Sequence, residues 1–355
     1  MAILGKSKQV ERQLRTSIER GRWQPGEAVP SERALSADLG VSRVAVRDAI
    51  LALRNDGLLV RRQGSGTFVA SSVGQRQVAV LCTLNDLTSG RRFFARAMIE
   101  ELKRRVEADG YKGVLGVGHG ETGEEVANSV SVLDPAQAKS IAGAVSVNRV
   151  YPAVHERLAD LHVPSVTVDV AMQTSPYEIL LDYGAMLDLG ARVLHEAGQD
   201  DFAIMAFDFS STERDAPDRV FESMTQSCLS AAGHRPERIV MVPEEHPELA
   251  HDAFIRWWRS ADRPRALLFA DDVLCDVACR AITELGICVP DDLLFITESS
   301  TASRFHFARK VACLEFSVPQ LADAAWDMLA GLIDGRSPDA PVRYVEPVYR
   351  PGETL

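Results

Sequence analysis

The sequence predicts an α/β chain of two parts: a small helical domain that ends in a β-hairpin, and a larger body in which strands and helices alternate. Three observations lead to this prediction. The first 70 residues carry three short amphipathic helical patterns and two short β-patterns. About ten strand–helix units follow from residue 77 onwards. The charge also changes, because residues 1–70 hold 12 Lys and Arg against 7 Asp and Glu, whereas the rest holds 27 against 43.

A basic first part joined to an acidic second part indicates a module that binds a polyanion, next to one that does not. The 355 residues suffice for two or three domains, and 46% hydrophobic and 25% charged residues are typical of a globular protein. No apolar run is long enough for a signal peptide or a membrane span, so we expect a cytoplasmic protein with no membrane partner.

The side chains that carry chemistry predict neither a cofactor nor a metal site. The six cysteines form no CxxC pair and are too sparse for a disulfide framework. Cys275 and Cys279 lie four residues apart, a spacing that suits a metal, but we favour two buried small side chains. His246 and His251 flank a proline, which argues against a zinc pair.

The first 55 residues predict three helices separated by turns. Ser31 is placed to cap the second helix and Ser42 the third, while Gly40 suits a left-handed helix end. The inward-facing residues recur at helical spacing. They are Val10, Leu14 and Ile18 in the helix from 6 to 20, Ala34, Leu35 and Leu39 in the second helix, and Val46, Ile50 and Leu53 in the third.

A β-hairpin is predicted next, since β-runs at 58–61 and 67–70 flank a glycine-rich segment at 63–66. Two helices joined by a glycine-containing turn form a helix-turn-helix. A hairpin directly behind them completes a winged helix. The sequence therefore predicts a winged-helix DNA-binding domain.

The third helix carries the predicted DNA-contacting face, which would enter the major groove. Its exposed early residues are Arg43, Val44 and Ala45, with Arg47 one turn further on. The planar fork of arginine can bind guanine or phosphate through two hydrogen bonds. On other elements, Arg33 would face the DNA backbone, and Arg61 and Arg62 flank the hairpin. A solvated surface is the alternative, but several arginines in the only basic segment favour DNA.

These residues resemble the winged helix of the GntR family. The resemblance rests on motifs at fixed spacing, namely PSERALS at 30–36, LGVSR at 39–43, VRDAI at 46–50, DGLL at 56–59 and GSGTFV at 64–69. It implies that a homodimer binds a palindromic, double-stranded operator DNA. The DNA-binding residues that it implies are Arg33, Ser42, Arg43, Val44, Arg47, Gly64, Ser65 and Gly66.

Residues 71–76 are small and polar and predict a linker. The alternation beyond it predicts parallel sheets with helices on both faces, in two lobes because the units are too many for one sheet. Ligands bind such sheets at the carboxyl ends of the strands. The predicted strands are 78–82, 114–117, 142–147, 165–168, 178–181, 202–207, 239–242, 266–269 and 294–297. The predicted helices are 93–109, 154–161, 186–196, 219–232, 249–259 and 273–285.

The order of these elements resembles the LacI-type effector domain, which is related to periplasmic sugar-binding proteins. The resemblance is carried by VAVL at 78–81, HVPSVTVD at 162–169, LDYGA at 181–185, FADD at 269–272 and ELGICVPDD at 284–292. A GntR-type domain on such a body is the arrangement of arabinose-repressor-type regulators. We accordingly expect a DNA-binding domain at 1–70, a linker at 71–76 and an effector-binding domain at 77–355. Lobe one would span about 77–172 and 317–336, and lobe two about 176–315 and 340–350.

The resemblance also implies an interlobe cleft that closes on a small-molecule effector, a sugar or a related metabolite. The effector-binding residues that it implies are Phe93, Phe94, Arg149, Asp182, Arg219, Asp271 and Phe316. Core packing is the alternative for the Phe93–Phe94 pair, a hinge or helix cap for Asp182, and a helix cap for Asp271. Two departures from the family pattern, at 85–92 and 298–300, border the cleft and put a standard sugar in doubt.

An enzyme is the main alternative for the body, since some GntR-type domains precede a pyridoxal-phosphate enzyme. That chemistry needs a Schiff-base lysine, and none of the four body lysines lies in a small-residue loop typical of cofactor attachment. No GxSxG motif and no P-loop occurs. The β-rich runs 165–168 and 266–269 argue against a wholly helical body. We therefore predict a ligand-responsive repressor that is not an enzyme, with an activator as the alternative.

Overall fold

Contacts within the computed structural model divide the chain into two units, Met1–Arg76 and Gln77–Leu355, called the head and the body below. The structure describes residues 6–55, 58–62, 66–70, 76–88, 92–120, 122–148, 151–169, 175–208, 226–233, 235–244 and 246–355. The predicted linker residues 71–75 and the first part of the predicted helix 219–232 lie outside the described residues, and residues 226–231 are helical.

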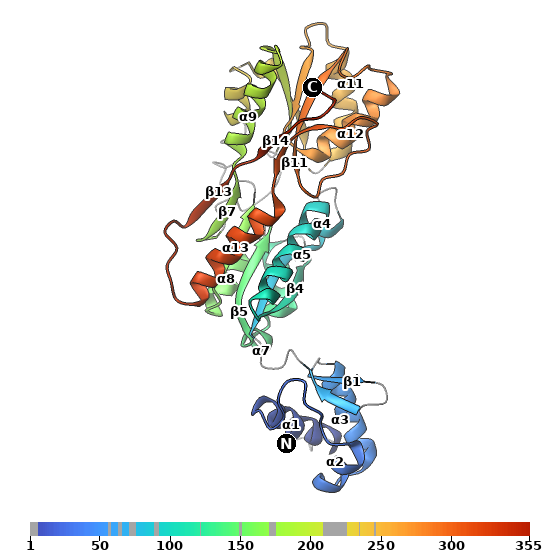
Figure 1. Ribbon diagram of the computed structural model, residues 1–355, viewed down its shortest axis with the longest axis vertical. Helices are drawn as coiled ribbons and strands as arrows, with labels where there is room; N and C mark the ends of the chain where they lie inside the picture. The colour runs from blue at the N-terminus through green and yellow to red at the C-terminus, as the bar shows by residue number, and fades with distance from the viewer. Residues whose placement is uncertain are drawn as a thin grey trace. The chain divides into compact units, whose positions relative to one another are not determined.

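In the residues that the structure describes, the head has three helices and a two-stranded antiparallel hairpin (Figure 1). The elements are α1 (Lys6–Glu19), α2 (Glu32–Leu39), α3 (Arg43–Asn55), β1 (Leu59–Arg62) and β2 (Gly66–Val69). Strand β1 begins and ends one residue after its predicted range of 58–61. Strand β2 begins and ends one residue before its predicted range of 67–70. The winged-helix prediction is confirmed.

The core of the head is formed by the apolar faces of these helices together with Trp23, Leu59 and Val69. All the predicted inward residues of α1 and α3 are buried, which confirms their spacing. Ala34 is an exception, because it is exposed on α2 while its neighbour Leu35 is buried. One residue along a helix is a turn of about 100°, so only one of these two neighbours can point into a narrow core.

Side-chain and glycine caps delimit the helices as predicted. The Ser31 Oγ accepts a hydrogen bond from the Ala34 amide at 3.2 Å, and the Ser42 Oγ accepts one from the Ala45 amide at 3.2 Å. Gly40 ends α2 with φ 62°, in the left-handed region that favours glycine. The short turn between α2 and α3 is thus fixed from both sides.

The body contains two six-stranded sheets, which confirms the predicted two-lobed α/β fold (Figure 1). The first has the order β13–β7–β6–β5–β3–β4 and is parallel throughout. Its strands are β3 (Gln77–Thr83), β4 (Lys112–Gly118), β5 (Ile141–Val147), β6 (Ser165–Asp169), β7 (Glu178–Leu181) and β13 (Val342–Val345). The predicted lobe bounds are wrong at β7 and β13, which they assigned to lobe two, because both strands pair into the sheet of lobe one. Helices α5 (Arg92–Ala108) and α13 (Val318–Ile333) pack on one face, and α6 (Gly123–Ser129) and α8 (Pro152–Asp160) on the other.

The second sheet has the order β14–β12–β11–β10–β8–β9, in which only the edge strand β14 is antiparallel. Its strands are β8 (Phe202–Asp208), β9 (Ile239–Pro243), β10 (Ala266–Phe269), β11 (Leu294–Ser300), β12 (Ala312–Phe316) and β14 (Val348–Arg350). Helix α9 (Tyr183–Glu196) packs on one face, and α11 (Ala250–Trp258) and α12 (Asp272–Glu284) on the other. Short helices α4 (Leu84–Thr88) and α7 (Pro135–Ala138) and the 3-10 turn at Ser131–Leu133 belong to the first lobe. The 3-10 turns at Pro236–Arg238 and Pro247–Leu249 belong to the second.

Polar side chains are buried in a row across the first sheet. Ser146, Thr167 and Glu178 occupy paired positions on β5, β6 and β7. The ring of His155 on α8 packs on this row, with its Nε2 3.4 Å from the Thr167 Oγ1. Burial lowers the pKa of His155 from 6.5 to about 4, because the charged imidazolium loses its hydration.

The body should therefore lose stability as the pH falls from about 6.5 to about 4. In this window the unfolded chain binds a proton that the folded chain excludes, at a cost of about 1.4 kcal/mol per pH unit. We expect His155→Gln to flatten this dependence, measured as the midpoint of urea unfolding at pH 7 and pH 5. His119→Gln, which changes an exposed histidine of the same lobe, serves as the control and should retain the wild-type slope.

Gly352 and Thr354, near the end of the sequence, pack against strands β11 and β12 of the second sheet. The Thr354 Oγ1 donates to the Phe295 carbonyl at 2.8 Å and accepts from the Ala312 amide at 2.9 Å. A Cβ on Gly352 would lie 2.2 Å from the Ala312 backbone nitrogen, so only glycine allows this close approach.

Gly352→Ala should destabilise the body by about 1–3 kcal/mol, as overpacking does elsewhere. The measurement is the melting temperature of the full chain. Gly331→Ala on α13 is the matched control, since its added Cβ meets nothing within 4 Å. The control should be neutral or stabilising, because alanine favours a helix. Equal melting temperatures for the two variants would contradict the argument.

Candidate DNA interface and effector site

The outer face of α3 presents the residues predicted to read DNA. Arg43, Val44 and Arg47 are exposed, and Val44 exposes 64% of its surface. Ala45 does not join them, which corrects the sequence-based expectation: it is 8% exposed. Ala45 lies one helical turn before the buried Ala49, so it falls on the inner face of α3. The exposed face of α3 therefore has one residue fewer than predicted, and two of its remaining three residues are arginines.

Arg47 is held by a neighbour that sequence reasoning missed. Its Nε lies 3.4 Å from the Oε2 of Glu32, the first residue of α2, and the side chains are 65% and 29% exposed. Arg33 and Arg43 are exposed and have no acidic partner within the described part of the chain. The sequence signal was available, because Glu32 is the acidic residue in the first turn of the helix before the recognition helix.

The β-hairpin and the helix cap Ser42 also belong to the predicted DNA surface. Gly66 is exposed at the start of β2 with φ 120°, a conformation that favours glycine, and Arg61 on β1 is exposed. Ser42 is exposed, and its hydroxyl oxygen accepts the Ala45 amide. Gly64, Ser65 and the Arg62 side chain lie outside the described residues.

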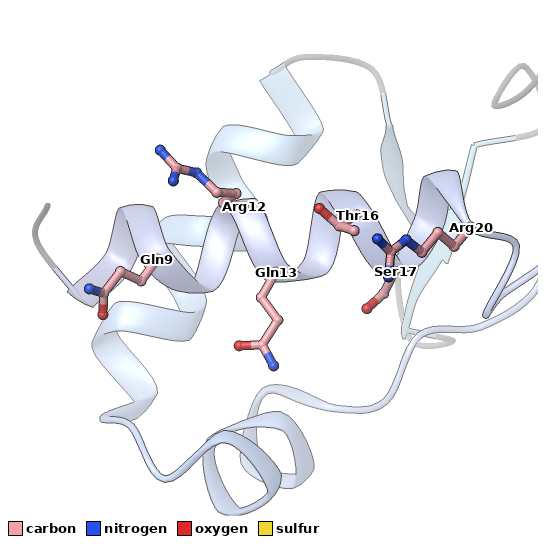
Figure 2. Close-up of a pocket in the computed structure, with 6 residues that line it drawn as sticks. All are labelled: Gln9, Arg12, Gln13, Thr16, Ser17 and Arg20. Atoms are coloured by element: carbon pink, nitrogen blue, oxygen red, sulfur yellow. The ribbon is translucent and has the colours of Figure 1, made fainter.

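A second polar surface of the head lies along α1 (Figure 2). It is an open hollow of about 380 Å³, and the described residues that line it are Gln9, Arg12, Gln13, Thr16, Ser17 and Arg20. The opposite side of α1 packs against the buried side of α3 through Val10, Leu14 and Ile18. The hollow and the exposed face of α3 therefore point in different directions, and Arg12 offers a matched control for the arginines of α3.

The predicted effector-binding residues occupy different environments. Phe93 is 39% exposed at the start of α5, whereas Phe94 packs partly against the core of the body. Phe316, at the end of β12, is 1% exposed and lies in that core. Arg149 and Arg219 lie outside the described residues. An effector role for these residues remains a prediction.

Asp182 and Asp271 each cap a helix at the carboxyl end of a strand. The Asp182 Oδ1 accepts from the Ala185 amide at 2.9 Å, just after β7, and the Asp271 Oδ1 accepts from the Val273 amide at 2.9 Å, just after β10. The alternative helix-cap interpretation is thus observed for both. Capping engages one carboxylate oxygen of each residue, so it does not by itself exclude a contact to a ligand.

Of the two segments that depart from the family pattern, residues 85–88 follow β3 and residues 298–300 end β11, so both lie at carboxyl ends of strands. Residues 89–91 lie outside the described residues. Asp86 joins the ends of β3 and β5, because its Oδ1 accepts from the Asn148 Nδ2 at 3.0 Å and its Oδ2 from the Thr83 amide at 2.8 Å. Glu298 near the end of β11 accepts from the Asp272 amide at 3.2 Å. Both acidic groups therefore fix the local backbone at the strand ends.

The cysteine pair that the sequence predicts to be buried lies on α12. Cys275 and Cys279 are buried on α12, as favoured from the sequence, and burial raises the pKa of the Cys275 thiol. Within the described residues, no group of three or more His, Cys, Asp or Glu side chains is arranged to hold a metal. No helix in the described ranges is long and apolar enough to cross a membrane.

The fold and the exposed arginines define a winged-helix domain attached to a two-lobed α/β body. Residues 6–69 match the family model described as "Bacterial regulatory proteins, gntR family". Residues 191–355 match the model of a "Periplasmic binding protein-like domain". The chain thus combines a GntR-type head with a periplasmic-binding-protein-like body, as the resemblances implied.

Individual relatives match part of the chain, and solved structures match its fold. The "Histidine utilization repressor" of Pseudomonas aeruginosa is 37% identical over 97 residues, which are 27% of this chain and 39% of the relative. The "HTH-type transcriptional repressor NagR" of Bacillus subtilis is 32% identical over 117 residues, which are 31% of this chain and 46% of the relative. The chain therefore spans less than half the length of these curated relatives.

Among solved structures, a lac repressor dimer bound to operator and the anti-inducer ONPF has a TM-score of 0.62 at 16% identity. The alignment covers 86% of this chain and 97% of that one. At this identity the likeness concerns the fold alone.

Proposed function

We propose that this chain is a ligand-responsive transcriptional repressor. A homodimer binds double-stranded operator DNA through the two heads, and a small metabolite bound by the body changes that affinity. The observation that carries the proposal is the exposed face of α3, where Arg43 and Arg47 stand one turn apart on a winged helix. The two relatives support the sign of the response, since both are called repressors.

The α3 face has the chemistry that base reading requires. Arginine donates two parallel hydrogen bonds to guanine O6 and N7, and an apolar side chain contacts the thymine methyl group. Arg43 and Arg47 supply the first kind of contact, and the exposed Val44 between them supplies the second. Arg33 and the Gly66 turn would contact the backbone. The Ser42 hydroxyl would do so as a donor, because its oxygen already accepts the Ala45 amide.

The body has the architecture of a sensor. Ligands bind parallel α/β sheets at the carboxyl ends of the strands. Asp182 and Asp271 lie at these ends. Carboxylates accept hydrogen bonds from hydroxyl or amino groups, and an exposed ring such as Phe93 packs on a C–H surface. A metabolite that binds one arrangement of the lobes better than another shifts their population, and so changes DNA affinity.

The proposal has two further parts. The first is that the chain is not an enzyme, and the second is that it is cytoplasmic. The four lysines of the body support the first part, because Lys103 and Lys112 are half-buried while Lys139 and Lys310 are exposed. None sits in the enclosed position that favours a Schiff base. For the domains we propose DNA binding at 1–70, a linker at 71–76 and effector binding at 77–355, which the division of contacts after Arg76 supports.

Arg43→Ala and Arg47→Ala should each weaken binding to a preferred duplex by roughly 1–3 kcal/mol. The duplex is one selected by the wild-type chain from a random pool, and binding is measured by gel shift at fixed salt. Arg12→Ala removes the same charge from the opposite side of the head and should have a much smaller effect. If all three variants bind like the wild type, the assignment of α3 as the reading element is wrong.

Asp182→Ser should abolish the response to a metabolite while operator binding stays intact. Serine keeps an oxygen for the helix cap, so the substitution removes the carboxylate without removing the cap. The metabolite comes from a thermal-shift screen of sugars and related compounds, because a ligand of the folded state raises the melting temperature. Loss of both DNA binding and the thermal shift would instead indicate a structural role for Asp182.

A further inference from the structure

The ion pair between Glu32 and Arg47 joins the two helices of the helix-turn-helix. Glu32 is the first residue of α2, and Arg47 lies in the second turn of α3. The donor is the Nε of Arg47, 3.4 Å from the Oε2 of Glu32. Arg43, one turn earlier on the same exposed face, has no acidic partner in the described ranges. Two arginines of the proposed DNA face are therefore held in different ways.

The atom that Glu32 engages matters for the chemistry of Arg47. A guanidinium has five N–H donors in a rigid fork, and a hydrogen bond at Nε leaves the donors of the two terminal nitrogens available. Two parallel N–H donors are what guanine O6 and N7 accept. An arginine tethered at Nε is thus oriented for a base edge, whereas an untethered arginine reaches phosphate oxygens with equal ease.

The charge of Glu32 acts in the same direction. A carboxylate next to Arg47 repels a phosphate that approaches the same guanidinium, and it repels the uncharged edge of a base much less. Phosphate contacts contribute affinity without sequence information, while base contacts contribute specificity. The pair therefore lowers the attraction of Arg47 to any DNA and keeps its attraction to the preferred sequence.

We propose that Glu32 is a positioning residue that makes Arg47 selective for a base edge over the DNA backbone. This inference rests on the proposed function of α3. A purely structural role is the competing explanation, because an acidic residue in the first turn of α2 also stabilises that helix through its dipole. That role would lower the melting temperature and would leave the preference between DNA sequences unchanged.

The test compares two duplexes for the full-length chain, one selected by the wild type from a random pool and one with the same bases scrambled. For Glu32→Gln we expect equal or tighter binding to the scrambled duplex, and a loss of discrimination of roughly fivefold or more. Glu11→Gln is the matched control, since it removes the same charge from another pair of the head, the half-buried Glu11–Arg15 at 3.1 Å on α1. It should leave the ratio of the two affinities unchanged.

A double-mutant cycle separates positioning from a direct contact. If Glu32 acts through Arg47, then Glu32→Gln should cause no further loss of discrimination in an Arg47→Ala background. Glu32→Asp keeps the charge and shortens the reach, and should retain part of the ratio; it also replaces Glu32→Gln should that variant fold poorly. The inference is overturned if Glu32→Gln keeps the wild-type ratio, or if its effect persists without Arg47.

The outcomes also separate this inference from the function on which it rests. A wild-type chain that selects no duplex and binds neither one overturns the proposed function, and the role of Glu32 with it. A wild-type chain that discriminates strongly, together with a Glu32→Gln variant that does so equally well, overturns the role of Glu32 alone.

Discussion

The packing of α3 against α1 is the constraint on which the head depends. Val46, Ile50 and Leu53 are buried on one side of α3 by Val10, Leu14 and Ile18 of α1. Because a helix repeats every 3.6 residues, burying that side leaves Arg43, Val44 and Arg47 on the opposite side. The same apolar contacts that stabilise the small domain thus determine which side chains can meet DNA. The turn between α2 and α3, fixed by Gly40 and Ser42, sets the position of α3 relative to Glu32.

In the body, the parallel sheets play the corresponding role. Every parallel strand of a sheet ends at the same edge, and the next helix begins there. Asp182 and Asp271 cap such helices, and Asp86 ties the end of β3 to the residue after β5. The residues with polar chemistry at these edges are therefore also the residues that hold the backbone in place. A ligand that hydrogen-bonds to them would act directly on the ends of the strands.

The sequence was sufficient for features that depend on local periodicity. The spacing of Val10, Leu14 and Ile18 and the caps Ser31 and Ser42 were predicted correctly, as was the buried strand at Ala266–Phe269. It was insufficient where one residue of rotation decides burial, as at Ala34 and Ala45.

Features that depend on tertiary pairing were also missed. The pairing of β12 with β14 requires segments more than 30 residues apart, and the Glu32–Arg47 ion pair joins residues 15 apart. Periodicity describes one element at a time, so it does not reveal which side chains of two elements meet. The environment of Phe316 is a further case, because only the packed sheet shows that this ring lies in the core.

The distribution of charge determines how much the local contacts of α3 matter for the proposed binding of DNA. Salt screens exposed charges over about 8 Å at physiological ionic strength, so the charges close to a bound partner matter most. Residues 1–70 carry only five positive charges in excess, which is a modest attraction for a polyanion. Among the described residues of this part, Arg15, Arg22 and Arg47 are already paired with acids. If the head binds an operator as proposed, so modest a general attraction leaves the preference for one sequence to directed contacts, and the exposed face of α3 is where the described residues offer them.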